Sequence, residues 1–176
     1  MIPSLKPPPE DEALYLARSA FQRARSGDAA TLATLLDAGL PVNLRNERGD
    51  TLLMLASYHG QLEATRLLLE RGADPERVND AGQSPLAGAA FKGLVEVAGL
   101  LLDKGARVDG PSGDGRTPLM FAAMFDQVGV LELLLERGAN HEHRDSARRT
   151  ALDYARAMGA RRTVAHLEAL AAWVAG

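Results

Sequence analysis

A hydroxyl residue returns at a constant spacing along most of the chain, and this repetition restricts the fold more than any other feature of the sequence. Thr51, Ser84, Thr117 and Thr150 follow one another at intervals of 33 residues. After each of the first three comes an apolar segment, then a leucine-rich segment that ends at a glycine. A fixed period of this length predicts a stack of similar units that together bury one continuous core.

Each repeat is expected to form two short helices and a projecting turn. In the repeat at residues 50–82, Thr51 is expected to cap a first helix that ends at Gly60, and a second helix is expected to end at Gly72. The polar stretch that follows carries the chain to the next cap. Small residues in the first helices allow a closer approach than the leucine-rich second helices do. The stack is therefore predicted to be concave on the first-helix side.

The first and last repeats depart from the pattern where inner repeats face a neighbour. Arg23 and Arg156 stand at positions that carry the small residues Ala56 and Ser57 in the second repeat. Asp11 is expected to cap a longer first helix. Because a stack needs end units with a polar outer face, these two repeats are predicted to be caps.

The repeats are predicted to form one domain at residues 11–176, preceded by a disordered lead at residues 1–10. The lead contains four prolines, three of them consecutive, and these prevent a helix. The five predicted repeats cover about residues 11–49, 50–82, 83–115, 116–148 and 149–176.

The repeated residues resemble the ankyrin repeat motif. That motif combines Thr-Pro-Leu-His in the first helix, three leucines in the second, and Gly-Ala-Asp before a hairpin turn. The fourth repeat matches it at residues 117–119, 133–135 and 138–140. The resemblance implies an all-α ankyrin repeat solenoid of paired antiparallel helices joined by β-hairpin-like turns, with about five repeats including two caps. It also implies a protein-interaction module.

Two departures from the motif are expected to change local rigidity and to leave the fold intact. Asp126 stands where other repeats end the first helix with glycine, and aspartate tolerates the left-handed conformation less well. The motif histidine, whose hydrogen bond to the cap threonine is therefore expected to be absent, is replaced by Met54, Ala87, Met120 and Asp153.

The composition excludes several classes of protein. The chain has no cysteine, which removes disulfides, thiolate catalysis and cysteine metal sites. A net charge of −3 gives no general attraction to nucleic acid or to a membrane surface. No apolar run approaches the ~18 residues of a membrane helix, so the protein is predicted to be cytoplasmic. Arginine supplies 17 of the 20 basic residues, which suggests a GC-rich bacterial genome.

No grouping of residues in the sequence predicts catalysis. His141 and His143 have a spacing found in metal sites, but they fall in an exposed turn with too few further ligands. The glycine-rich residues 110–116 lack the lysine of a phosphate-binding loop. The chain is therefore predicted to be no enzyme and to hold no metal or cofactor.

Aromatic residues gather at one repeated position, at the end of the first helices. At about 100° per residue from buried Leu53, both Tyr58 and His59 point away from the core. Stacking is expected to align them in two columns, Tyr58, Phe91, Met124 and His59, Lys92, Phe125. Exposed aromatic residues in line favour a partner-binding patch, although the same contacts would also stiffen the stack. Its polar edge is predicted at the hairpin tips, with Glu47, Arg48, Asp50, Asp80, Gln83, Asp114 and Arg116.

The leading prediction is that an unknown protein partner binds in the concave groove and along the hairpin edge of a monomer. The alternative is an accessory or regulatory subunit that contacts an acidic protein or nucleic acid through a basic C-terminal face. Nucleic acid is the weaker of these two ligands, because no aromatic residues are interleaved with the basic ones. The basic face consists of Arg144, Arg148, Arg149, Arg156, Arg161 and Arg162.

Overall fold

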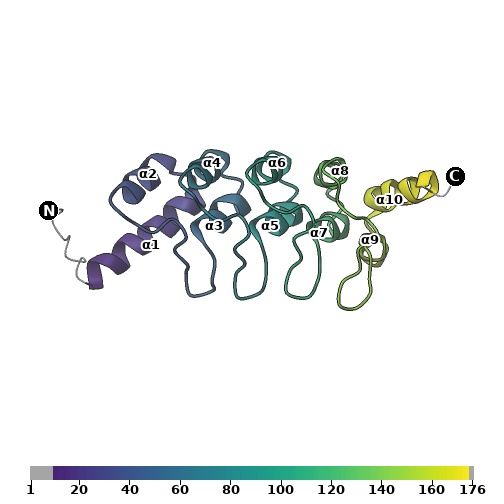
Figure 1. The fold of residues 1–176 in the computed structure, drawn as a ribbon, viewed down its shortest axis with the longest axis horizontal. Coiled ribbons are helices and arrows are strands. Elements are labelled where there is room, and N and C mark those ends of the chain that lie inside the picture. Colours follow the sequence, from purple (N-terminus) through teal and green to yellow (C-terminus); the bar gives the residue numbers. More distant parts are fainter. Residues whose placement is uncertain (1–9, 175–176) are drawn as a thin grey trace.

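A computed structural model describes residues 10–174, and the regular structure within that range is helical. The helices alternate between two layers, with α1, α3, α5, α7 and α9 in one and the even-numbered helices in the other (Figure 1). This confirms the predicted all-α solenoid of paired helices. The helices are α1 (Glu10–Ser26), α2 (Ala29–Asp37), α3 (Leu52–Tyr58), α4 (Leu62–Glu70), α5 (Pro85–Lys92), α6 (Val95–Asp103), α7 (Pro118–Met124), α8 (Val128–Glu136), α9 (Ala151–Met158) and α10 (Arg161–Val174).

The predicted caps begin the first helices of the four later repeats. The side chain of Thr51 accepts a hydrogen bond from the backbone N–H of Met54, and the other three caps bond in the same way. The expected loss of the motif histidine bond is wrong at Asp153. Its carboxylate accepts from the N–H of Thr150 at 2.8 Å and from the Thr150 hydroxyl at 2.9 Å. Aspartate thus replaces histidine as the partner of the cap.

Both ends of the stack depart in detail from the sequence prediction. Helix α1 begins at Glu10, so Asp11 lies inside its first turn and is not the cap. Residues 1–9 of the predicted lead lie outside the described range. Within residues 10–174, no helix has both the length and the apolar character needed to cross a membrane.

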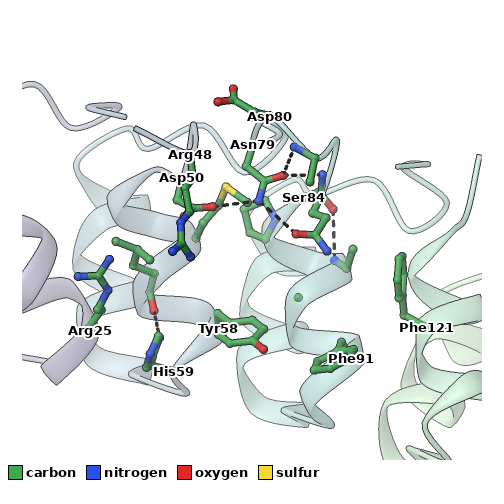
Figure 2. Close-up of a pocket in the computed structure, with 17 residues that line it drawn as sticks. Arg25, Arg48, Asp50, Tyr58, His59, Asn79, Asp80, Ser84, Phe91 and Phe121 are labelled. Carbon is green, nitrogen blue, oxygen red and sulfur yellow. Dashed lines mark hydrogen bonds between the residues drawn. The ribbon is translucent and has the colours of Figure 1, made fainter. Parts of the chain in front are cut away.

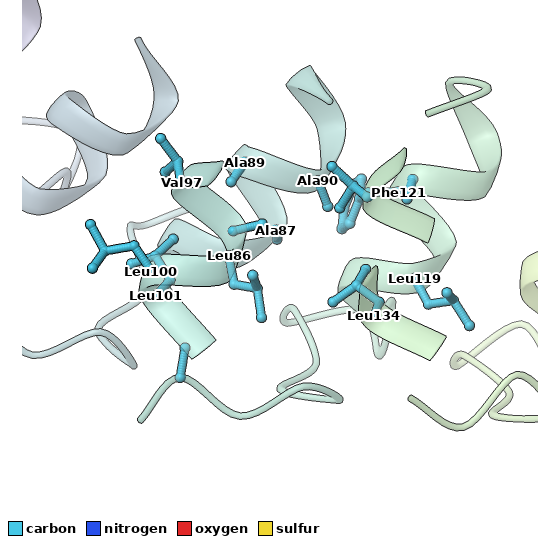
Figure 3. Close-up of a cluster of buried hydrophobic side chains, with 14 of the residues drawn as sticks. Leu86, Ala87, Ala89, Ala90, Val97, Leu100, Leu101, Leu119, Phe121 and Leu134 are labelled. Atoms are coloured by element: carbon cyan, nitrogen blue, oxygen red, sulfur yellow. The ribbon is translucent and has the colours of Figure 1, made fainter. Parts of the chain in front are cut away.

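The core runs continuously between the two layers. Its largest buried side chains are leucines such as Leu86 and Leu101 from one repeat and Leu119 and Leu134 from the next (Figure 3). The first helices pack on one another more closely than the second helices do, as their alanines predict.

Hairpin turns project from one side of the stack and are linked to one another in a row (Figure 1). The N–H of Asp80 donates to the carbonyl of Arg48 at 3.0 Å, and the N–H of Ser146 donates to the carbonyl of Asp114 at 3.1 Å. Each turn therefore depends on its neighbour for its position.

One hairpin turn holds a strained residue that can be relieved. Gly82 and Gly115 have φ values of 72° and 84°, whereas Arg148 occupies the same position of the last turn with φ 61°. A side chain in this conformation costs about 1 kcal/mol or more. Arg148→Gly is expected to raise the free energy of unfolding by about 1 kcal/mol, as measured by urea denaturation. Gly115→Ala, which creates the same strain one repeat earlier, is expected to lower it. Equal or lower stability of Arg148→Gly would contradict this account.

Candidate functional site

A groove of about 640 Å³ lies between the hairpin turns and the first helices of the second and third repeats (Figure 2). Helices α3 and α5 form its floor, with buried Leu55 and Phe121 among the lining side chains. The turns that precede these helices form its polar side. It is the largest hollow in the described part of the chain.

The structure brings about half of the predicted binding residues together in this groove. Lys92, Met124 and Phe125 continue from it along the first helices, and Glu47, Asp114 and Arg116 lie at the hairpins outside its lining. The predicted residues that line it are Arg48, Asp50, Tyr58, His59, Asp80, Gln83 and Phe91.

The aromatic side chains form one continuous row in place of the two predicted columns. Tyr58 and Phe91 are stacked with ring centroids 6.2 Å apart, and Phe125 meets Phe91 edge-on at 4.4 Å. Met124 instead packs against the core, because it is the last residue of α7 and Phe125 is the C-cap beyond it. Tyr58 remains 39% exposed and Phe125 38% exposed. The row therefore stiffens the stack and still presents aromatic surface.

A cation adds to this row. The Nζ atom of Lys92 lies 5.4 Å from the centroid of the Tyr58 ring, and His59 meets the same ring edge-on at 5.6 Å. His59 is itself held in place, since its Nδ1 atom lies 3.0 Å from the carbonyl oxygen of Leu55.

The carboxylates of the groove are already partnered inside the protein. Asp50 accepts hydrogen bonds from the side-chain amides of Asn79 at 2.9 Å and Asn46 at 3.2 Å. Asp80 pairs with Arg45 at 2.9 Å. These acids hold the hairpins in place, and this use reduces their availability to a ligand.

Three groove residues were not predicted from the sequence. Asn79 bridges two hairpins, and its counterpart Asn46 stands 33 residues earlier, so the register could have identified it. Gly88 stands in α5 where the neighbouring repeats carry Leu55 and Phe121. Arg25 reaches the groove from the end of α1, which no repeat pattern predicts.

The predicted basic face is largely neutralised by acids from elsewhere in the chain. Arg149 pairs with Asp145, Arg156 with Glu168, and Arg162 with Asp126. Glu168 and Asp126 lie outside the stretch in which the sequence suggested a basic excess. The sequence estimate of that excess was therefore too high.

The histidine pair is separated by the hairpin geometry. The Nε2 atom of His143 lies 3.2 Å from the carbonyl oxygen of Gly115 in the preceding turn. Between residues 10 and 174, the structure contains no group of three or more histidine, aspartate or glutamate side chains placed to hold a metal.

Comparison with known proteins identifies the repeats. A family description of ankyrin repeats in three copies matches residues 20–112, and the single ankyrin repeat matches residues 114–146. The chain belongs to the ankyrin repeat family. It shares 50% identity over 67 residues with a putative ankyrin repeat protein of Pseudomonas aeruginosa. That match covers 38% of this chain and 39% of the relative.

Ankyrin repeats are generally protein-interaction modules without catalytic activity. The fold and family predictions are thereby confirmed.

Proposed function

We propose that this chain is a non-catalytic module that binds a partner protein through the groove between its first helices and its hairpin turns. The aromatic row of Tyr58, Phe91 and Phe125 carries the proposal, because aligned and partly exposed aromatic side chains mark interaction surfaces. Polar turns border this row on one side, in keeping with the usual anatomy of an interface. Action as one domain at residues 11–176, a monomeric state and a cytoplasmic location remain predictions.

Removing two rings of the row tests the proposal. The double variant Tyr58→Ala and Phe91→Ala is expected to weaken partner binding by roughly thirtyfold or more, the effect of losing a central aromatic anchor. Partners are captured on the intact chain from cells of the source organism, and their affinity for each variant is then measured with purified proteins. Tyr15→Ala is the matched control, because Tyr15 is 71% exposed on α1 and lies outside the groove. Unchanged affinity of a folded double variant would refute the proposal.

The alternative of a basic C-terminal face has less support, since half of its arginines are paired with carboxylates. Arg144 and Arg161 form no ion pair with a described acidic residue and are the ones to test. Loss of salt-sensitive binding in Arg144→Gln and Arg161→Gln, with no loss in the groove variant, would favour this alternative.

A further inference from the structure

The floor of the groove contains a glycine where the repeats on either side have a large apolar residue. Gly88 lies inside α5, 33 residues after Leu55 and 33 before Phe121. Glycine lowers helix stability relative to alanine, so this position is costly for the fold. A Cβ atom built at Gly88 would meet a single neighbouring atom within 4 Å, Cδ2 of Tyr58 at 3.3 Å. The missing side chain therefore leaves a space between Leu55 and Phe121.

Protein atoms fill this space only in part. Tyr58 is the side chain closest to it, and Tyr58 is 39% exposed. Leu55 and Phe121 are both buried and both line the groove. A leucine-sized or phenylalanine-sized side chain from another molecule would complete the column that the repeats form elsewhere.

The opposite end of the groove carries positive charge that the chain does not neutralise. Arg25 and Arg48 both line the groove, and neither guanidinium group forms an ion pair or hydrogen bond with another residue in the described range. The acids that line the groove, Asp50 and Asp80, are occupied by Asn79 and Arg45. Figure 2 shows Arg25, Arg48 and His59 at one end and Phe91 and Phe121 at the other. The groove therefore combines a cationic end with an apolar gap.

We infer that the groove binds a segment of a partner protein that carries an acidic side chain close to a leucine-sized or phenylalanine-sized one. The acidic group pairs with Arg25 and Arg48, and the apolar side chain enters the space over Gly88. Guanidinium groups suit carboxylates because both are planar and bond in pairs. The inference rests on the proposed function and specifies the chemistry of its ligand.

A random-peptide library displayed on phage, selected on the full chain, tests this inference. Enriched peptides are expected to combine Asp or Glu with a nearby Leu, Ile, Met or Phe. Synthetic copies of these peptides are then titrated by fluorescence polarisation. Arg25→Glu with Arg48→Glu is expected to weaken binding about tenfold or more, and added salt is expected to weaken binding to the intact chain. The matched control is Arg144→Glu with Arg161→Glu, which changes the charge equally outside the groove.

Filling the gap tests the apolar half of the inference. Gly88→Leu places in α5 the residue found at Leu55, and it is expected to weaken peptide binding about tenfold. Gly88→Ala is the smaller variant. Since alanine favours the helix and the exposed Tyr58 ring can move, this protein is expected to unfold at a higher temperature while binding more weakly. Circular dichroism verifies that both variants are folded.

The outcomes separate the inference from the proposed function. Enriched peptides without acidic residues, or equal binding by the Arg25 and Arg48 variant, would overturn the inference. If those peptides still lost affinity in the Tyr58→Ala and Phe91→Ala protein, the groove would remain the binding site. If they bound that protein as tightly as the intact chain, both proposals would fail. A library that yields no enriched peptide would also count against the inference.

Discussion

Asp145→Ala is expected to lower the free energy of unfolding by about 3 kcal/mol, because it leaves several donors in the last hairpin turn without an acceptor. The side chain of Asp145 is only 2% exposed. It accepts hydrogen bonds from the Tyr154 hydroxyl at 2.6 Å, the N–H of Arg149 at 2.8 Å and the N–H of Ala147 at 2.9 Å. The Arg149 guanidinium also lies 4.4 Å from the centre of the Tyr154 ring, which holds the cluster together.

Tyr154→Phe is the matched control for this prediction. It removes one donor and leaves the backbone bonds of Asp145 in place, so it is expected to cost about 1 kcal/mol. Urea denaturation followed by circular dichroism measures both variants. If Asp145→Ala were no less stable than Tyr154→Phe, the carboxylate would not be the centre of this turn.

The fold was predictable from the sequence because its determinants are repeated. Thr51 and its counterparts start helices, Gly72 and its counterparts end them, and both recur at one spacing. A residue that matches across repeats carries the same structural role, so the register identifies it. The contribution of Asp145 was missed because its partners, Tyr154 and Arg149, are specific to the last repeat.

The site was predictable only in part because binding residues are those that differ between repeats. Helical periodicity correctly placed Tyr58 and Phe125 at exposed positions. It gave no information on pairing across repeats, so the contact of Phe91 with Phe125 was not expected. Arg25 is brought to the groove by the end of α1, a helix longer than the inner first helices.

Asp126→Ala is expected to lower the free energy of unfolding by about 2–3 kcal/mol, chiefly by detaching α10 from the stack. The carboxylate of Asp126 accepts hydrogen bonds from the N–H of Arg162 at 3.0 Å, the N–H of Thr163 at 2.9 Å and Nε of Arg162 at 2.9 Å. It thus caps α10 from the preceding repeat. The sequence suggested that Asp126 would loosen this corner, and its φ of 56° is indeed strained. The structure shows that the same residue joins two repeats.

Glycine at this position separates backbone strain from capping. Asp126→Gly relieves the strained φ but loses every side-chain bond, so its stability is expected to lie between those of the intact chain and Asp126→Ala. Amide hydrogen exchange is expected to become faster in α10 in both variants while changing little in α5. Equal protection of α10 in all three proteins would contradict the capping role.

Acid is expected to abolish the contribution of Asp126. The Arg162 side chain, followed by the Thr163 N–H, holds the pKa of Asp126 below its ordinary value. A carboxyl with a lowered folded-state pKa stabilises the fold fully above its unfolded pKa of about 3.9, and this stability is lost as pH falls through the folded-state value. The difference in unfolding free energy between the intact chain and Asp126→Ala should therefore stay constant from about pH 7 to about pH 5 and shrink in stronger acid. Urea titrations of both proteins across this range measure it, and a difference that persisted at the lowest pH would show that the charge of Asp126 is not what holds α10.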